Sequence, residues 1–460
     1  MKGWVNNVKK NRFEIDMCNG SIMDKLISFS LPLMVSGILQ LAFNAVDIIV
    51  VGRFSGSQAL AAVGSTTALI NVFTNLFIGI SLGANVLAAR FYAAGKDREM
   101  SETVHTSITL ALISGIMMAV IGVLLAKWAL EIMGTPDDVI GQSALYMRIY
   151  FMGMPFFMLY NYGAAILRAI GDTRRPLIFL IISGIANAAL NMILVILFHM
   201  RVAGVAIGTI ISQLISCVLV LTCLYRSEGS YQLRFSKLKI NGAYMEQIFQ
   251  VGVPAGIQST VINLSNALLQ SSVNSFGEIT VAGNSAAANI EGFVYVAMNS
   301  LYQAAISFTG QNVGAGKYER VNRILYTAEA CVIVVGLVLG NGALFFGRQL
   351  LSIYTENPAV IDTGMKRMNV IARTYALCGM MDVMVGSLRG LGYSVMPMIV
   401  SLIGACGLRL LWIFTFFRME QFHTVTSLYL TYTWSWIITF SAHVICWIIV
   451  RRKLGRQWNS

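Results

Sequence analysis

The sequence predicts an all-α integral membrane protein, with twelve transmembrane helices in two six-helix bundles related by a pseudo-two-fold axis along the membrane normal. Three observations predict this fold class. First, 56% of the 460 residues are hydrophobic and 12% are charged, about half of the roughly 25% charged residues in soluble domains. Second, runs such as ALISGIMMAVIGVLLA are apolar at every phase, unlike the alternating strands of a membrane β-barrel. Third, the two halves of the sequence repeat each other.

This composition excludes a soluble enzyme, a disordered scaffold and a disulfide-rich secreted domain. The seven cysteines are scattered without a CxxC spacing, and the four histidines lie far apart. We therefore expect no metal-binding cysteine framework and no cofactor. The formal net charge is +12. In a membrane protein this excess is typical of cytoplasmic loops, so we expect membrane lipids around the chain and no nucleic-acid partner.

A span with its loop takes roughly 38 residues, which leaves room for about twelve spans. The first apolar stretch begins at Leu26 and is too long for a signal-peptide core, so we expect it to remain as a span. The first bundle, residues 25–225, has expected spans at 25–52, 59–89, 101–130, 140–167, 176–198 and 202–225.

The longest polar interruption, residues 226–242, is the expected linker between the bundles. The second bundle, residues 243–450, has expected spans at 243–275, 280–311, 320–347, 360–388, 395–417 and 424–450. Polar tails at 1–24 and 451–460 flank the two bundles.

Positive residues between the spans fall mainly on one side of the membrane. That side holds Lys2, Lys9, Lys10, Arg12, Lys25, Arg90, Lys96, Arg98, Arg168, Arg174, Arg175, Arg226, Arg234, Lys237, Lys239, Lys317, Arg320, Arg323, Arg389, Arg451, Arg452, Lys453 and Arg456. The opposite side holds Arg53, Lys127, Arg201, Arg348 and Arg418. The rich side is expected to be cytoplasmic. The sequence thus predicts a multi-pass protein of the inner (plasma) membrane with both termini inside the cell.

A shift of about 221 residues lays the first half of the chain on the second. The matched positions include Leu167–Gly171 with Leu388–Gly392, Pro176 with Pro397, Ala94–Lys96 with Ala315–Lys317, and Pro32 with Pro254. Each half has six expected spans, an even number, so both halves have the same orientation in the membrane. Two such bundles with a site between or within them are typical of a transporter that works by alternating access.

These motifs resemble a known family, the MATE (multidrug and toxic compound extrusion) transporters of bacterial type. The resemblance covers roughly residues 24 to 450. It is carried by LRAIGDTRRP at Leu167–Pro176, LRGLGYSVMP at Leu388–Pro397, FNAVDIIVVGR at Phe43–Arg53, FYAAGKDRE at Phe91–Glu99 and GQNVGAGKYERV at Gly310–Val321.

The resemblance implies a secondary active antiporter, not an enzyme, that exports cationic or amphipathic organic compounds in exchange for H+ or Na+. We expect it to be a monomer. The wider group also includes lipid-linked oligosaccharide flippases, so a flippase for such a precursor is the alternative. A flippase needs a basic cavity, for which Arg148, Arg373 and Arg409 are candidates.

Ionisable residues inside a span are candidates for function because they are costly to bury in a membrane. Asp47 lies in the first span, with Asn44 one turn before it. Asn187 and Asn191 are four residues apart and share one face of the fifth span. The resemblance places an acid in the first helix near this asparagine pair. Asp47 with Asn44, Asn187 and Asn191 is thus the predicted site for cation coupling or substrate, with Na+ possible near Asp47, Asn187 and Asn191. The alternatives are an interfacial pair of Asp47 with Arg53, and structural hydrogen bonds between the asparagines.

Glu291, Asp382 and Arg409 are the candidates in the second half. An unpaired arginine near the middle of a span is very expensive, so Arg409 is expected to pair with Glu291 or Asp382. A weaker hypothesis concerns an adaptable pocket of bulky side chains. Its members are Met154, Phe157, Tyr160, Tyr295, Met298 and Met381.

Overall fold

A computed structural model describes residues 13–458, and within this range the regular structure is helical without any β strand. Residues 1–12 of the expected first tail and residues 459–460 of the last lie outside the described residues. Lys2, Lys9, Lys10 and Arg12 are among them.

Helices cover the six stretches expected to be spans of the first bundle. They are α1 (Ile22–Phe54), α2 (Ser57–Ala93), α3 (Asp97–Ile132), α4 (Asp137–Met152) with α5 (Met154–Ala169), α6 (Arg174–Met192) with the π-helix η1 (Ile193–Leu197), and α7 (Arg201–Arg226). The fourth span differs from the continuous helix expected, because it breaks at Gly153 two residues before Pro155. Proline removes a helix hydrogen bond and clashes with the preceding turn, so the break has a local cause.

The second bundle follows a linker that contains the short helix η2 (Phe235–Lys237). Its spans are α8 (Gly242–Asn274), α9 (Glu278–Gly314), α10 (Tyr318–Phe345) with α11 (Gly347–Ser352), α12 (Pro358–Gly390), α13 (Val395–Ser401) with η3 (Leu402–Gly407) and α14 (Leu408–Phe414), and α15 (Val425–Trp458). The short helices η4 (Phe416–Arg418) and η5 (Glu420–Phe422) join the last two spans. Helices again cover all six stretches expected to be spans.

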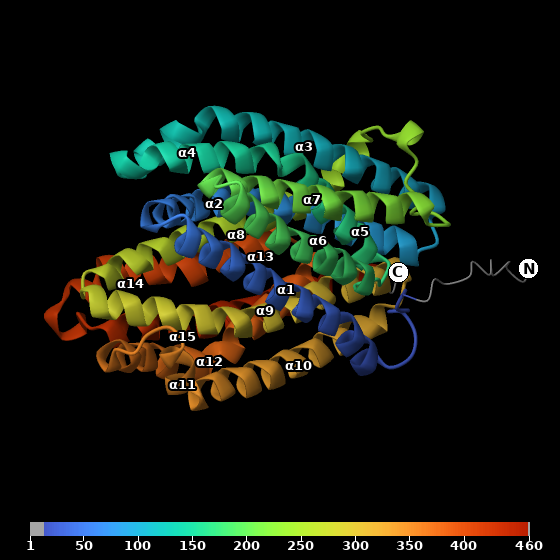
Figure 1. Ribbon diagram of the computed structural model, residues 1–460. Coiled ribbons are helices and arrows are strands. Elements are labelled where there is room, and N and C mark those ends of the chain that lie inside the picture. Colours follow the sequence, from blue (N-terminus) through green and yellow to red (C-terminus); the bar gives the residue numbers. More distant parts are fainter. Residues whose placement is uncertain (1–12, 459–460) are drawn as a thin grey trace, which may run out of the picture.

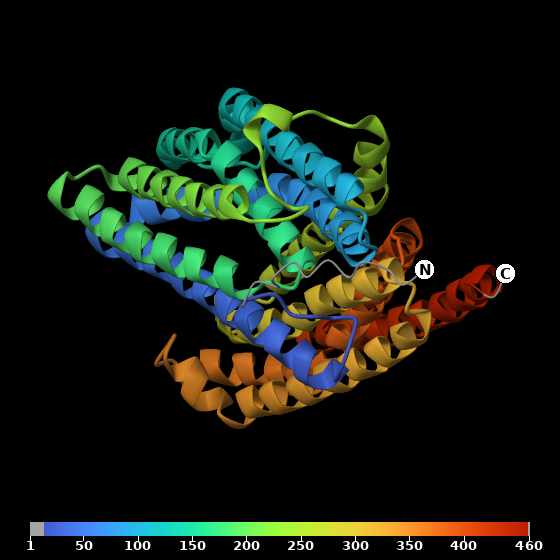
Figure 2. The same cartoon turned by 90° about the vertical axis from the view of Figure 1, so that its right-hand side faces the viewer.

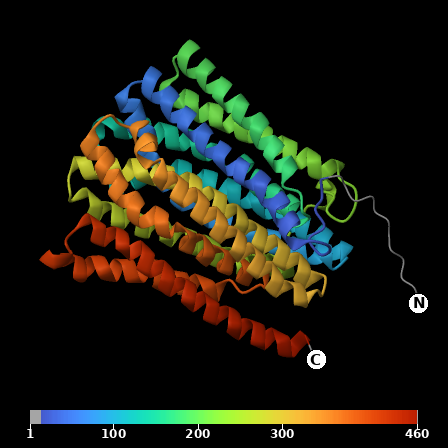
Figure 3. The same ribbon diagram turned by 90° about the horizontal axis from the view of Figure 1, so that it is seen from below.

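In Figure 1, α3, α4 and α7 of the first bundle lie at the top and α10, α11 and α12 of the second lie at the bottom, with α1 between them. Eight helices of the described part are long and apolar enough to cross a membrane by length and composition alone. Figure 3 shows that α1 begins and α15 ends at the same end of the molecule, as twelve spans require. We call this the basic end, because the loops predicted to be rich in Lys and Arg lie there.

The internal repeat is visible in the backbone. Gly171 and Gly392, 221 residues apart in sequence, have φ values of 93° and 86° at the same turn of each bundle. Gly95 and Gly316, also 221 apart, have φ values of 67° and 69°. Side chains disfavour this region of φ and glycine does not, so both halves keep glycine where the turn demands it.

The two bundles meet most closely where α2 crosses α8. Gly79 and Gly83 on α2 face Gly252 and Gly256 on α8, and a Cβ on any of the four would overlap backbone atoms of the other helix. Both helices thus carry a GxxxG pattern, which allows backbones to approach in membranes. This pattern can be read in the sequence, although it was not among the motifs from which the fold was predicted.

The first helix does not stay within its own bundle. Near the basic end α1 packs against α9 and α10, and Leu26, Phe29 and Leu33 belong to the apolar core of the second bundle. The rings of Phe29 and Phe308 meet edge to face at 5.7 Å. Toward its other end α1 packs against α6. Figure 2 shows α1 along the boundary between the bundles, so this helix physically connects the two.

Three hydrogen bonds join the bundles in the half of the molecule toward the basic end. Ser307 on α9 donates to Asn85 on α2 (3.1 Å), and Gln311 donates to the Ala169 carbonyl (2.7 Å). Arg90 donates to the Gly390 carbonyl (2.9 Å). We call these contacts the seam; they hold the bundles together at the basic end.

Candidate functional site

Asp47 lies near the end of α1 that is far from the basic end, and its side chain is half-buried. The Asn191 side chain on α6 donates a hydrogen bond from Nδ2 to Asp47 Oδ1 at 2.5 Å. Arg53 is exposed, and among the described residues Asp47 forms no ion pair. The interpretation of Asp47 as the partner of Arg53 is therefore wrong, and the carboxylate is available for other chemistry.

The asparagine pair extends this contact into the bundle. Asn191 Nδ2 also donates to Asn187 Oδ1 at 2.9 Å, as the four-residue spacing predicts. Asn187 Nδ2 in turn approaches the hydroxyls of Thr209 (3.4 Å) and Ser212 (3.3 Å) on α7. Asn187 is 7% exposed and Asn191 is fully buried. A continuous polar chain thus joins α1, α6 and α7.

The other atom of the Asn191 amide, Oδ1, is buried and accepts no hydrogen bond. It packs against Gly208 on α7, where a Cβ would overlap it. The π-helix η1 begins two residues after Asn191, and such turns are frequent at functional sites. Tyr146 and Tyr150 on α4 lie within electrostatic range of the Asp47 carboxylate. The site therefore draws on four helices of the first bundle.

The fourth predicted member, Asn44, takes a different position. It is exposed on α1 and, among the described contacts, makes no hydrogen bond to Asp47, Asn187 or Asn191. The structure brings together three of the four residues predicted for this site.

In the second bundle the prediction for Arg409 is wrong. Glu291 on α9 pairs instead with Arg367 on α12, at 2.7 Å from Nη2 to Oε2 and 3.1 Å from Nε to Oε2. Arg367 also donates to Asn284 at 2.8 Å. Arg367 was not among the predicted residues, although it lies inside the expected span 360–388, where an arginine needs a partner.

Arg409 is held by neutral groups. Its Nε donates to the Ser435 hydroxyl at 2.9 Å and its Nη1 approaches Asn266 Oδ1 at 3.4 Å. The guanidinium carbon lies 4.2 Å from the centre of the Tyr432 ring and 5.8 Å from that of Trp436. Aromatic faces attract cations, most strongly where water is excluded. This attraction explains how a buried arginine persists here without a carboxylate.

Asp382 on α12 forms no ion pair with Arg409 among the described residues. Its neighbours are Tyr295 and Arg389, both within electrostatic range. Arg389 itself donates to the Tyr302 hydroxyl and to Gln258 Oε1 (2.8 Å). The three candidates of the second bundle therefore have different direct partners. They still lie in one region, because Cys378 is within electrostatic range of all three and Tyr432 faces both Arg367 and Arg409.

The six residues of the predicted pocket are not gathered in one place. Met154, Met298 and Met381 are buried in three different apolar cores. Tyr160 donates to the Pro176 carbonyl at 3.2 Å, whereas Tyr295 is 38% exposed. In the described conformation these side chains mostly pack the helices.

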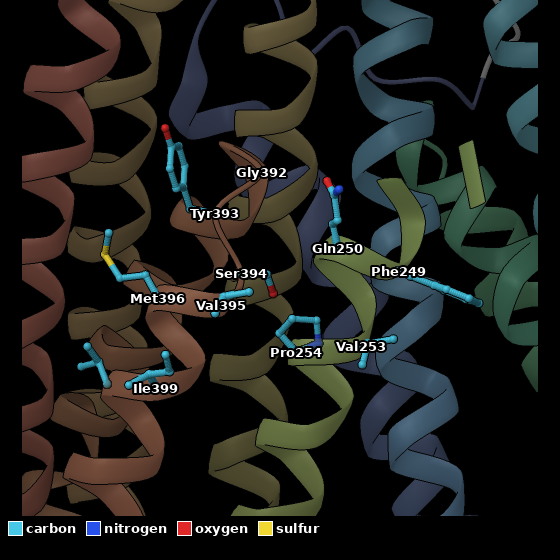
Figure 4. A pocket seen from close by; sticks show the side chains of 11 residues that line it. Phe249, Gln250, Val253, Pro254, Gly392, Tyr393, Ser394, Val395, Met396 and Ile399 are labelled. Atoms are coloured by element: carbon cyan, nitrogen blue, oxygen red, sulfur yellow. The ribbon is translucent and has the colours of Figure 1, made fainter. Parts of the chain in front are cut away.

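A groove of about 830 Å³ opens elsewhere, between α8 and the start of α13. In Figure 4 the Pro254 ring points toward Ser394 and Val395 across it. Its walls are mostly apolar and include none of the predicted site residues. Since α8 and α13 both begin at the basic end, the groove lies in that half of the molecule, far from Asp47.

Comparisons with known proteins agree with the internal repeat and the fold. The family model MatE matches residues 32–193 and 254–415, two segments that begin 222 residues apart as the repeat predicts. Probable multidrug resistance protein YoeA of Bacillus subtilis (strain 168) is 28% identical over 84% of this chain and 85% of that protein. Probable multidrug resistance protein YpnP of the same strain is 26% identical over 86% and 88%.

A solved structure, described as the outward-facing conformation of a multidrug resistance MATE family transporter, aligns with a TM-score of 0.87. The alignment covers 96% of this chain and 98% of that chain at 18% sequence identity. At this identity the likeness is one of fold alone.

Proposed function

Because the chain belongs to the MatE family, we propose that it is a secondary active multidrug exporter, which exchanges cationic or amphipathic organic compounds for H+ or Na+ by alternating access. Relatives named as multidrug resistance proteins, aligned over more than four-fifths of the chain, support the export of drugs. The chain is a transporter and not an enzyme; the exchange for a cation is the proposed part.

One observation carries the coupling step: the hydrogen-bonded chain from Asp47 through Asn191 to Asn187. A carboxylate binds a proton more readily when water leaves its surroundings and loses it when water returns. A cationic compound nearby favours the ionised form, so compound and proton compete for one negative charge. Asp47 can therefore release one as it binds the other.

The direction of the Asn191 amide favours H+ over Na+. Its Nδ2 group donates to both Asp47 Oδ1 and Asn187 Oδ1, so an N–H donor occupies the point where these two oxygens converge. A sodium ion, as a hard cation, needs several converging oxygens. Those would converge only if the amide turned and directed Oδ1, which has no hydrogen bond here, toward Asp47.

The flippase alternative is not favoured. A basic cavity would need Arg148, Arg373 and Arg409 together, but Arg148 and Arg373 are exposed while Arg409 is enclosed by Tyr432 and Trp436. Efflux of a fluorescent organic cation from proteoliposomes, with a pH gradient or a sodium gradient imposed separately, tests the proposed function. Absence of efflux under both gradients would contradict it.

A first prediction concerns orientation in the inner membrane. The linker residue Ser236 is exposed in a positively charged stretch at the basic end, which we propose is cytoplasmic with both termini. A cysteine at Ser236 should resist an impermeant maleimide in intact cells and react in inside-out vesicles. Labelling in intact cells would reverse the orientation.

A second prediction concerns the Asn191 amide. Gly208→Ala places a methyl group where Asn191 Oδ1 lies, so the amide must shift from Asp47. A hydrogen bond to a charged group contributes enough to change a rate about tenfold, and we expect gradient-driven export to fall by about that factor. Asn191→Ala and Asn187→Ala should have effects of similar or smaller size.

The matched control is Gly141→Ala, because that helical glycine has open space around its Cβ position. Initial efflux rates at equal protein content are the measurement. Full export by Gly208→Ala and Asn191→Ala would remove the amide from the coupling site.

A further inference from the structure

Residues 13–21, which precede α1, form a non-helical strap at the basic end that contacts both bundles. The strap crosses the molecule where the seam holds the bundles together. It takes no part in the coupling site, because Asp47 lies near the opposite end of α1. Its contacts differ on the two sides.

The leading residues of the strap attach to the first bundle and to Tyr231 of the linker, which packs in the core of that bundle. The Glu14 carboxylate accepts hydrogen bonds from the hydroxyls of Tyr231 (2.6 Å) and Tyr92 (2.9 Å). Burial, together with the Glu14 carboxylate, raises the pKa of Tyr231 to about 12, so its hydroxyl stays a donor at neutral pH. Ile15 donates its amide to the Gly171 carbonyl at 3.3 Å.

Gly171 is required for close packing as well as for its positive φ. A Cβ on Gly171 would overlap the Ile15 backbone. The turn that carries the LRAIG motif therefore leaves room for the backbone of the strap to pack against it; we call this contact the seat of the strap.

On the second bundle, the attachment is deeper. Met17 is fully buried in the same core as Leu26 of α1. Asn312 donates to the Met17 carbonyl (3.1 Å) and Lys317 to the Cys18 carbonyl (3.0 Å). Arg320 donates to the Gly20 carbonyl at 3.1 Å. A buried apolar side chain and three side-chain donors thus fix residues 17–20 to the second bundle.

If the protein works by alternating access, as proposed above, the bundles must separate at the basic end in one state. The contacts of the strap with one of the two bundles must then break. Residues 17–20 continue directly into α1, which shares the core of the second bundle. The contacts of Glu14 and Ile15 with the first bundle include no fully buried anchor comparable to Met17. They also lie at the far end of the strap, so they are the ones to break.

We propose that residues 13–21 are a latch across the basic end, fixed to the second bundle, and that Glu14 with Tyr92 and Tyr231 is its catch. When the catch is closed, it favours the state in which the seam is intact. When it opens, the bundles are free to separate and expose the seam to the solution on that side.

The test measures opening of the seam without any drug. Ser307 is 1% exposed and bonded to Asn85 across the seam, so Ser307→Cys reacts with a maleimide only when the bundles part. The cysteine is placed in a chain whose seven native cysteines are replaced by serine or alanine. An impermeant maleimide is then applied to inside-out vesicles.

Two variants open the catch by different routes: Glu14→Ala, and Tyr92→Phe combined with Tyr231→Phe. Each removes both hydrogen bonds to the carboxylate, and hydrogen bonds to charged groups are strong enough to shift an equilibrium about tenfold. We expect the labelling rate of the single cysteine introduced by Ser307→Cys to rise about tenfold in both variants. Tyr225→Phe, at an exposed tyrosine stacked on Phe235, is the matched control and should leave the rate unchanged.

The outcome separates the latch from the proposed function. Unchanged labelling in both variants, in a protein that exports an organic cation, would overturn the latch and leave the exporter standing. Raised labelling in a protein that exports nothing under either gradient would support the latch and count against the exporter.

Discussion

Asp47→Asn is expected to leave the protein folded and to reduce gradient-driven export to the level of vesicles without protein. The substitution keeps the shape of the side chain and removes its charge. Asn191 can still donate to the oxygen that remains in the new amide, because its Nδ2 contacts only one of the two carboxylate oxygens of Asp47. Packing at this half-buried position should therefore change little. Without a charge, the site can neither bind a proton nor attract an organic cation.

Drug efflux from proteoliposomes at matched protein content is the measurement, under a pH gradient and a sodium gradient in turn. The matched control is Asp138→Asn, an exposed carboxylate in the first turn of α4, which should export at the parent rate. Undiminished export by Asp47→Asn under both gradients would remove Asp47 from the mechanism. Loss under the pH gradient alone would identify the proton as the coupling ion.

Much of this fold could be predicted from the sequence, because its determinants are local. Each span is long and apolar, and the turns between spans keep glycine where φ is positive, as at Gly171 and Gly392. The Asn187–Asn191 contact follows from helical spacing. The contact of Asn191 with Asp47 joins different helices, and the family resemblance, not spacing, placed it.

Features that depend on which helices meet could not be derived in this way. The sequence pointed to Arg409 as the arginine in need of a carboxylate, but Tyr432 and Trp436 from α15 supply its surroundings. By its place in the sequence α1 belongs to the first bundle, but its first half packs in an apolar core of the second bundle. The strap and its seat at Gly171 depend on the same crossing.

The Glu291–Arg367 pair provides the prediction with the largest effect on stability. Both side chains are buried, and the guanidinium also faces the rings of Tyr429 and Tyr432 at 5.6 and 5.7 Å. Removing one partner leaves an uncompensated charge where water cannot reach it, which costs about 3–5 kcal/mol. Arg367→Met and Glu291→Met should each lower the melting temperature and folded yield of detergent-purified protein substantially.

The chain offers a matched control for this pair. Arg348 and Asp362 lie at the same 2.7 Å separation, but their side chains are 66% and 55% exposed. Exposed pairs contribute about 0–1 kcal/mol, so Arg348→Met should scarcely change the melting temperature. The double variant Glu291→Met with Arg367→Met leaves neither charge behind, and apolar replacement of a buried pair is often neutral. It should therefore recover most of the stability lost by either single variant. If the single variants have the same melting temperature as the Arg348→Met control, the buried pair does not hold α9 and α12 together.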